Sequence, residues 1–245
     1  MVRFNLEEHL RKEHRVTPVS EYLREIVYGG NDGIVTTFAV VAGFAGAQRD
    51  PTGSAVPVIS VLLFGLANLF ADGLSMGLGS FLSLRADQDV YKNAKIKEHH
   101  EIVHQPGNEY EETLEILRRR GFTVADARTI ASIYRKNPPY WTEFMMKDEL
   151  EMTSPEKEKP LFVALFTFFS FVTFGAIPLL PFIFLAATVN HFPISVLCTA
   201  GALLLLGILR ASVTQRAAIR GIVETLLVGG ISAGAAYVVG SFFRA

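Results

Sequence analysis

Long apolar stretches and one long polar stretch set the pattern of this chain. Apolar residues dominate in five runs, at residues 26–47, 56–84, 161–187, 192–209 and 222–243. Because about 20 mostly apolar residues are enough for a helix to cross a bilayer, each run predicts one transmembrane helix. The fold class that follows is an all-α membrane protein with five transmembrane helices and a polar, helical insert between the second and the third.

The same pattern divides the chain into four segments. These are an N-terminal arm at 1–25, spans one and two within 26–84, the insert at 85–160, and spans three to five within 161–245. The arm begins MVRFNLEEHLRKEHR, which is charged and lacks the apolar core of a signal peptide. We therefore expect no cleavable leader.

Turn and capping residues predict several helices within the insert. The first is expected to run on from the second span. Asn108 is expected to cap the next helix and Gly121 to end it. Thr123 and Asp126 form a capping pair that opens a third helix. Pro138–Pro139 then breaks the chain before a fourth helix, which carries two adjacent methionines.

The distribution of Lys and Arg in the short flanks of the spans predicts the orientation. The N-terminal arm and the link between spans four and five are rich in basic residues, namely Arg3, Arg11, Lys12, Arg15 and Arg24, and Arg210, Arg216 and Arg220. The links after spans one and three contain one such residue between them, Arg49. Because basic flanks stay in the cytosol, the N-terminus and the insert are expected to be cytoplasmic, and the C-terminus to lie on the opposite side.

Overall charge and cysteine content narrow the classes of function. The net charge is -1 over 245 residues, so nothing in the composition suggests nucleic acid as a partner. The mean hydropathy of +0.31 is high for a soluble protein and fits a membrane protein. The single cysteine, Cys198, lies in an apolar run and excludes an intramolecular disulfide framework.

Polar side chains inside the first two spans form the first candidate site. Asp32 lies within YGGNDGIVTT, where an ionised carboxylate costs at least roughly 2.5 kcal/mol, so such a group is a candidate for function. Asn68, Asp72 and Met76 recur every four residues and share one helical face. We expect these four residues to line a cation or proton pathway. The structural alternatives are an interfacial or capping Asp32 and a space-filling Met76.

Carboxylates and methionines in the insert form the second candidate site. They fall into three groups on three predicted helices: Glu98 and Glu101, Glu109 and Glu112, and Met145, Met146 and Glu149. A step of three residues places two carboxylates on one helical face, where they can share a cation. Carboxylates alone suit Mg, Ca or Mn, and thioether sulfur shifts the preference toward softer transition metals, so mixed ligation suits Fe(II) or a related divalent ion.

Each of these groups also has a purely structural interpretation. Glu-x-x-Glu steps are common on solvated helices, and Glu109 and Glu112 lie in a first turn, where acidic residues suit the helix dipole. The two methionines would equally form an apolar seam against neighbouring helices. Three histidines lie nearby and are either ligands or solvent-exposed groups: His99, His100 and His104. Of these, the last two have the helical i, i+4 spacing.

Several motifs resemble the vacuolar iron transporter family. They are REIVYGGNDGIVTTFAVVAGFAGA and ADGLSMGLGSFLS in the first two spans, FGAIPLLPF in the third, and LGILRASVTQR before the last. The resemblance extends from about Arg24 to the C-terminus. It implies a five-span homodimer in a lipid bilayer that moves Fe(II), and in some members Mn(II), out of the cytosol in exchange for protons. It implies no enzymatic activity and no prosthetic group.

Carried over residue by residue, the resemblance implies that the metal ligands are the seven insert residues above, from Glu98 to Glu149. Asp32 matches the pathway carboxylate of the family and Met76 its second-span methionine. Mn(II), Zn(II) or Co(II) would also suit the insert ligands. Ser80 stands where many relatives have glutamate, and Asn68 is neutral where a carboxylate could assist. These departures bear on proton coupling and metal preference, and the cell membrane and a vacuole-type membrane are both compatible with the orientation.

Two other functions are compatible with a metal-binding insert. A membrane-tethered ferroxidase would use glutamate-rich helices, typically with Glu-x-x-His motifs. The stretch EHHE contains no such motif, and thioether ligands are poorly suited to a site that oxidises iron. A metal sensor would need the spans only as an anchor, and Asp32 and Asp72 argue against that because an anchor should avoid buried carboxylates.

Overall fold

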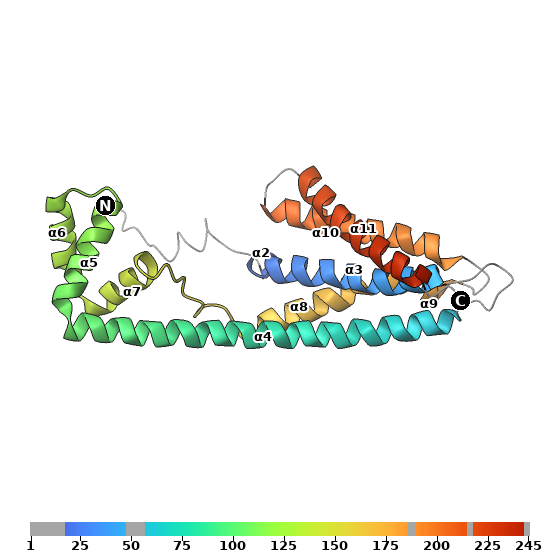
Figure 1. Cartoon of the computed structure of the whole chain (residues 1–245), viewed down its shortest axis with the longest axis horizontal. Helices are drawn as coiled ribbons and strands as arrows, with labels where there is room; N and C mark the ends of the chain where they lie inside the picture. Colours follow the sequence, from blue (N-terminus) through green and yellow to red (C-terminus); the bar gives the residue numbers. More distant parts are fainter. Residues whose placement is uncertain (1–17, 48–56, 186–189, 215–217, 243–245) are drawn as a thin grey trace, which may run out of the picture. The chain divides into compact units, whose positions relative to one another are not determined.

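The computed structural model describes residues 18–47, 57–185, 190–214 and 218–242. Over these residues every regular element is a helix (Figure 1). The chain forms two compact units, one of Met1–Ser80 with Leu161–Ala245 and the other of Phe81–Pro160. They are called the apolar unit and the polar unit below, and α4 (Val58–His104) begins in the first and ends in the second.

The apolar unit is a bundle of helices around α3. Besides α4 its elements are α2 (Pro18–Glu21), α3 (Leu23–Ala47), α8 (Pro160–Gly175), η1 (Ile177–Leu179), α9 (Leu180–Phe184), α10 (His191–Thr214) and α11 (Ala218–Phe242). α3 packs against both α10 and α11, which also pack against each other (Figure 1). Ile34 of α3 is fully buried in one core cluster, and Phe38 and Val41 are buried in a second.

Glycines allow α3 to approach its neighbours closely. A Cβ added at Gly29 would lie 2.6 Å from the carbonyl oxygen of Thr167 on α8, and one at Gly33 would clash with the carbonyl oxygen of Phe171. Toward its other end, a Cβ at Gly46 would clash with the carbonyl oxygen of Tyr237 on α11. Small residues at helix crossings let backbones touch where no hydrophobic effect draws the helices together. These contacts make α3 the element around which the unit is packed.

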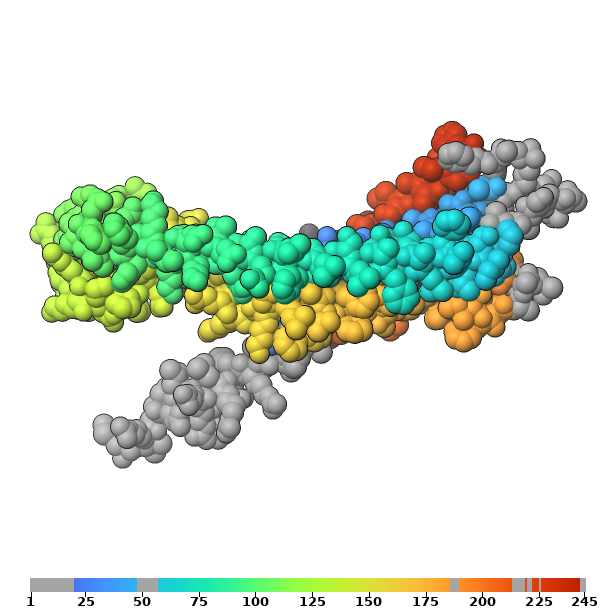
Figure 2. All heavy atoms as spheres, turned by 90° about the horizontal axis from the view of Figure 1, so that it is seen from below, coloured from blue at the N-terminus to red at the C-terminus, as the bar shows by residue number. Residues whose placement is uncertain are grey.

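The third apolar run supplies one candidate span, Pro160–Phe184, as predicted, but this segment is not one continuous helix. α8 ends at Gly175, and η1 and α9 follow, each with a proline in its first turn. Proline lacks the backbone N–H and its ring clashes with the preceding turn, which ends or kinks a helix. The carbonyl oxygen of Pro178 accepts a hydrogen bond of 2.7 Å from Ser195 Oγ on α10. α8 lies along α4 (Figure 2). A Cβ at Gly77 of α4 would be 3.0 Å from the carbonyl oxygen of Ala164 on α8.

Four helical segments are long and apolar enough to cross a membrane: α4, Pro160–Phe184, His191–Ser212 and Ile222–Phe242. The 25 residues of α3 are long enough but less apolar, because Asn31, Asp32 and several glycines lower the hydropathy. The count of five spans therefore stays a prediction. Most of the basic residues on which the predicted orientation rests lie outside the described residues: Arg3, Arg11, Lys12, Arg15, Arg49 and Arg216.

The polar unit consists of the second part of α4 and three shorter helices, α5 (Pro106–Arg119), α6 (Val124–Tyr134) and α7 (Pro138–Asp148). Two predicted boundaries are confirmed. Thr123 Oγ1 accepts a hydrogen bond of 3.2 Å from the backbone N–H of Asp126, which caps α6. Gly121 follows the end of α5 with a φ of 97°, a left-handed conformation that glycine adopts without strain.

The predicted cap at Asn108 is wrong. α5 begins at Pro106, two residues earlier, and Gln105 occupies the N-cap position without a side-chain hydrogen bond. Proline is favoured in the first turn because its φ is already helical and its missing N–H would have no partner there. Asn108 instead lies inside the first turn, where its Nδ2 donates a 3.1 Å hydrogen bond to the side chain of Gln105.

A glycine substitution tests the packing around α3. We expect Gly33→Ala to destabilise the protein by about 1–3 kcal/mol, because the added methyl group meets the backbone of α8, which cannot move aside. Gly201→Ala on α10 is the matched control, since a Cβ there has nothing within 4 Å. The measurement is the fraction of monodisperse protein in detergent after heating. Equal survival of Gly33→Ala and wild type would contradict the described contact between α3 and α8.

Candidate metal site

Three carboxylates from three helices converge in the polar unit. Glu98 lies on α4, Glu109 lies in the first turn of α5, and Glu149 is the C-cap residue of α7. One oxygen of each carboxylate lies within 4.8 Å of the others. These three residues are called the carboxylate triad below. Because three oxygens at this spacing can surround one ion, the triad is the candidate site of this chain for a divalent cation.

Burial makes the triad an unusual place for negative charge. The exposed fractions of Glu98 and Glu109 are 4% and 5%. Glu98 Oε1 and Glu109 Oε2 are buried and have no hydrogen-bond partner, whereas Glu149 is exposed. An ionised carboxylate removed from water is strongly unfavourable unless an opposite charge or hydrogen bonds compensate it. The triad therefore needs either protons or a cation.

The pKa values of the triad reflect this conflict. Burial, and then the charges of Glu109 and Glu149, raise the pKa of Glu98 from 4.5 to about 8. Burial, followed by the charges of Glu112 and Glu109, raises the pKa of Glu149 from 4.5 to about 7. Burial and the charge of Glu112 also raise the pKa of Glu109. Protons thus occupy the triad near neutral pH, and a cation must displace them.

The two adjacent methionines are packed inside the polar unit. Met145 and Met146 are both 0% exposed, and Met145 belongs to a core cluster with Ile102 and Trp141. The hydroxyl of Thr113 donates to the carbonyl oxygen of Glu109 at 2.8 Å and lies 3.4 Å from Sδ of Met145. α7 therefore buries both methionines, and Met145 contacts the side of α5 that carries Glu109.

Thr113 and Trp141 support the site and were missed from the sequence. Trp141 Nε1 donates a buried 2.7 Å hydrogen bond to Thr113 Oγ1, which joins α7 to α5. Thr113 lies four residues after Glu109 and so shares its helical face, a spacing that could have identified it. The position of Trp141 follows from no local pattern, because its partner is 28 residues away in the chain.

The remaining predicted ligands of the insert lie near the triad without belonging to it. Glu101 forms an ion pair of 3.6 Å with Lys97, and its charge acts on all three carboxylates. Glu112 is exposed, and its charge raises the pKa of Glu109 and Glu149. The structure therefore brings three of the seven predicted ligands together at ligand distance. The charges of two more, Glu101 and Glu112, act on carboxylates of the triad.

The histidines of the insert lie outside the triad. His99 is exposed, and its Nδ1 is 3.0 Å from Thr142 Oγ1. His100 and His104 are exposed and stack on each other. Glu101 and His104 do form one Glu-x-x-His step, just beyond the stretch EHHE considered above. It is the single such step in the sequence, whereas ferritin-like di-metal centres take one from each of two helices.

The polar residues predicted to line a pathway come together in the apolar unit. Asn68 Nδ2 donates a 2.6 Å hydrogen bond to Asp72 Oδ2, one turn further along α4. Asp72 is also close enough for its charge to act on Asp32 of α3. Met76 is half-buried on the same face of α4 as Asp72. Two carboxylates, an amide and a thioether therefore occupy neighbouring helices of this unit.

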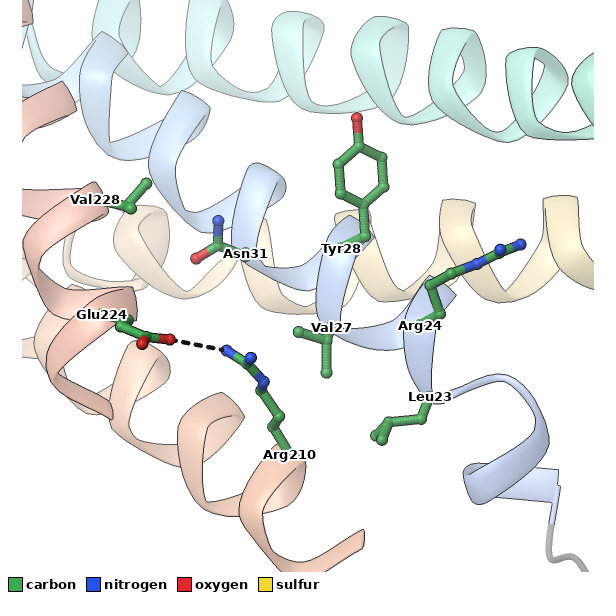
Figure 3. Close-up of a pocket in the computed structure, with 8 residues that line it drawn as sticks. All are labelled: Leu23, Arg24, Val27, Tyr28, Asn31, Arg210, Glu224 and Val228. Carbon is green, nitrogen blue, oxygen red and sulfur yellow. Dashed lines mark ion pairs between the residues drawn. The ribbon is translucent and has the colours of Figure 1, made fainter. Parts of the chain in front are cut away.

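A pocket of about 560 Å³ also opens in the apolar unit, between α3, α10 and α11 (Figure 3). Arg210 and Glu224 form an ion pair of 3.8 Å in it, and Asn31 Oδ1 is buried there without a hydrogen-bond partner. The other lining residues are Leu23, Arg24, Val27, Tyr28 and Val228. None of the four predicted pathway residues lines this pocket, so it is separate from the carboxylates of α3 and α4.

The raised pKa values predict how the stability of the polar unit depends on pH without metal. A carboxyl group whose pKa is about 8 when folded and 4.5 otherwise favours folding while protonated, so its contribution is lost as pH rises between these values. We expect the metal-free protein to unfold at a lower temperature at pH 8 than at pH 5. The single tryptophan, Trp141, is buried in this unit, so its fluorescence reports the transition.

Glu98→Gln is the variant that isolates this effect, because the amide keeps the shape and cannot ionise. Its midpoint should fall less between pH 5 and pH 8 than that of wild type, while Glu115→Gln, an exposed carboxylate in an ion pair on α5, should behave as wild type. A midpoint that rises with pH in the wild type would refute the burial of the triad.

Comparisons with a family model and with individual relatives point to the same protein family. The VIT family model matches residues 23–241. The chain is 32% identical over 232 residues to "Vacuolar iron transporter 1" of Eucalyptus grandis, covering 95% of this chain and 89% of that protein. It is 34% identical over 226 residues to "Vacuolar iron transporter" of Centaurea cyanus, covering 92% and 89%. It is 31% identical over 223 residues to "Vacuolar iron transporter" of Plasmodium falciparum, covering 86% and 77%.

These relatives are named as transporters rather than as enzymes. Four helical segments of membrane-spanning length and apolarity make the chain an integral membrane protein. The family model covers nearly the whole described chain, including both the apolar and the polar unit. The chain therefore belongs to the VIT family.

Proposed function

We propose that this chain is a metal transporter that exports Fe(II), and also Mn(II), from the cytosol in exchange for protons. The observation that carries the proposal is the carboxylate triad, in which Glu98 and Glu109 are buried with oxygens that have no partner. The names of the relatives support iron as the transported metal. Fe(II) is substrate here, and no prosthetic group is involved.

The polar unit would capture the metal. Glu98, Glu109 and Glu149 would supply the first oxygens, because their ligand atoms already lie within 4.8 Å of one another. Glu101 and Glu112 would complete the charge around the ion. Met145 and Met146 would add sulfur, which favours Fe(II) over harder ions. Since the triad holds protons near neutral pH, capture would release protons to the cytosol.

The apolar unit would carry the metal across the membrane. Asp32, Asp72 and Met76 would form the route, and Asp32 would alternate between proton and metal. The hydrogen bond from Asn68 to Asp72 supports this role, because it orients one oxygen of Asp72 and leaves the other for a cation. Asn68 is neutral, so these two carboxylates would supply the charge, whereas a protein with an acidic residue there would have three.

Five spans and a homodimer complete the proposal. α3 would be the fifth span, since it packs against α10 and α11, which are themselves apolar enough to cross a membrane. The outer face of α4 supports a bilayer and a second copy as its neighbours, because Leu63, Leu74, Leu78 and Leu82 are exposed. The N-terminus and the polar unit would face the cytosol, and the C-terminus the opposite side.

Uptake of Fe(II) into liposomes is the experiment that tests the proposal. Purified protein is reconstituted, and protease treatment of a separate sample measures the fraction of molecules whose polar unit faces outward. We expect uptake that grows with an inside-acid pH gradient, because protons leaving the vesicle would drive metal inward. The absence of uptake of both Fe(II) and Mn(II) would reject transport and favour a membrane-anchored metal sensor instead.

Asp32→Asn tests the pathway in the same assay. The amide removes the charge that would pair with a metal or bind a proton, so we expect transport to be lost while the size-exclusion profile of the protein stays unchanged. Asp87→Asn is the matched control, an exposed carboxylate on α4 outside the proposed pathway. Normal transport by Asp32→Asn would exclude this residue from the route.

Replacement of both methionines by leucine tests the role of sulfur. Met145→Leu with Met146→Leu nearly conserves volume, so packing should change little. We expect the ratio of Fe(II) to Mn(II) affinity to fall by about tenfold, because only the softer ion gains from thioether ligation. Anaerobic titrations followed by Trp141 fluorescence measure both affinities, with Met152→Leu as control. An unchanged ratio would mean that the two methionines only pack.

A further inference from the structure

Two exposed histidines at the end of α4 form a pair that the transport proposal does not use. His100 and His104 are four residues apart and so stand one turn apart on the same helical face. Their rings stack with centroids 3.9 Å apart and an angle of 19° between the planes. Two imidazoles are therefore already side by side at the surface of the polar unit.

The hydrogen bonding of His104 fixes which of its nitrogens can bind a metal. Its Nδ1 lies 2.8 Å from the carbonyl oxygen of His100. A carbonyl oxygen only accepts, so Nδ1 must carry the proton, and in the neutral ring the lone pair is then on Nε2. Metal-binding histidines are oriented in the same way, with the second ring nitrogen donating to a carbonyl or carboxylate.

The spacing of the pair matches a known zinc-binding geometry. His100-Glu101-Ile102-Val103-His104 has the pattern H-E-x-x-H, in which the two histidines of one helical face bind Zn²⁺. Zn–N bonds of about 2.0–2.1 Å in a tetrahedral site place two ligand nitrogens roughly 3.3 Å apart. The two rings are only 19° from parallel, so their in-plane lone pairs do not converge in the stacked arrangement, and the ring of His100 must turn about its side-chain torsions to share an ion with Nε2 of His104. Glu101 pairs with Lys97 at 3.6 Å, so it does not serve as the base of a peptidase here.

We propose that His100 and His104 form a second metal site, separate from the carboxylate triad, that takes imidazole-preferring ions such as Zn²⁺ and excludes Mn²⁺. Imidazole suits Zn and Ni, whereas Mn prefers carboxylate and water oxygens. In the described part of the chain, the triad is the one group of three acidic, histidine or cysteine side chains at ligand distance. Water must therefore fill the other positions at the histidine pair, and bound ions exchange readily.

Metal stoichiometry on the full-length protein, with any affinity tag removed, tests this site. Equilibrium dialysis at one fixed pH near neutrality measures bound Zn²⁺ and, separately, bound Mn²⁺. We expect His100→Ala and His104→Ala each to lose one equivalent of Zn²⁺ per chain and no Mn²⁺. His99→Gln is the matched control: it is an exposed histidine on the same helix outside the pair, and it should keep the Zn²⁺ stoichiometry of wild type.

Two results would overturn the proposal. Unchanged Zn²⁺ binding in both alanine variants would mean that the pair binds no metal, and parallel loss of Zn²⁺ and Mn²⁺ would mean that the histidines serve the triad. An independent test modifies the histidines of the wild-type protein with diethyl pyrocarbonate and identifies the modified residues by mass spectrometry. Zn²⁺ should protect His100 and His104 and Mn²⁺ should not, while equal modification with and without Zn²⁺ would count against the site. Neither measurement depends on whether the protein transports iron.

Discussion

Repulsion among three carboxylates is the constraint on which the polar unit depends. Glu98, Glu109 and Glu149 bring their oxygens within 4.8 Å of one another, and the first two are almost fully buried. Like charges this close, out of water, cannot all ionise unless a cation joins them. α4, α5 and the end of α7 can therefore meet only while protons or a metal ion occupy the space between them. Because the pKa values of Glu149 and Glu98 are near 7 and 8, protons and a metal ion compete for the triad at physiological pH.

A buried polar network connects two of the three helices that carry the carboxylates. Trp141 donates to Thr113, Thr113 donates to the carbonyl oxygen of Glu109, and Met145 packs against the same hydroxyl. Buried hydrogen bonds of this kind fix geometry because breaking one leaves a polar group without a partner. The network joins α5, which carries Glu109, to α7, whose C-cap residue is Glu149.

The sequence predicted the parts of this molecule that depend on local pattern. The cap at Thr123, the stop at Gly121 and the run of α4 through residue 104 follow from turn chemistry and periodicity. The breaks at Pro178 and Pro181 were missed because the run from 161 to 187 is uniformly apolar, and hydropathy alone hides a kink. Proline at the first position also overrode the expected cap at Asn108.

The residues of the candidate metal site could be predicted from the sequence, but which of them lie together could not. Glu-x-x-Glu steps identified Glu98 and Glu109, and the group with Met145 and Met146 identified Glu149, but spacing within one helix does not say which carboxylates of different helices meet. That choice depends on tertiary contacts such as Trp141 with Thr113, which are 28 residues apart. The same limit applies to Asp32 and Asp72, whose proximity depends on the glycine-mediated packing of the apolar unit.

Proton release on metal binding tests the central claim most directly. Calorimetric titration of Mn(II) into the protein at pH 7, in two buffers of different ionisation enthalpy, gives the number of protons that each ion displaces. Displacement of protons from the triad predicts a release of about one proton or more per ion, reduced in Glu98→Gln. A binding enthalpy that is the same in both buffers would mean that no proton leaves, and would contradict a site in which metal and protons compete.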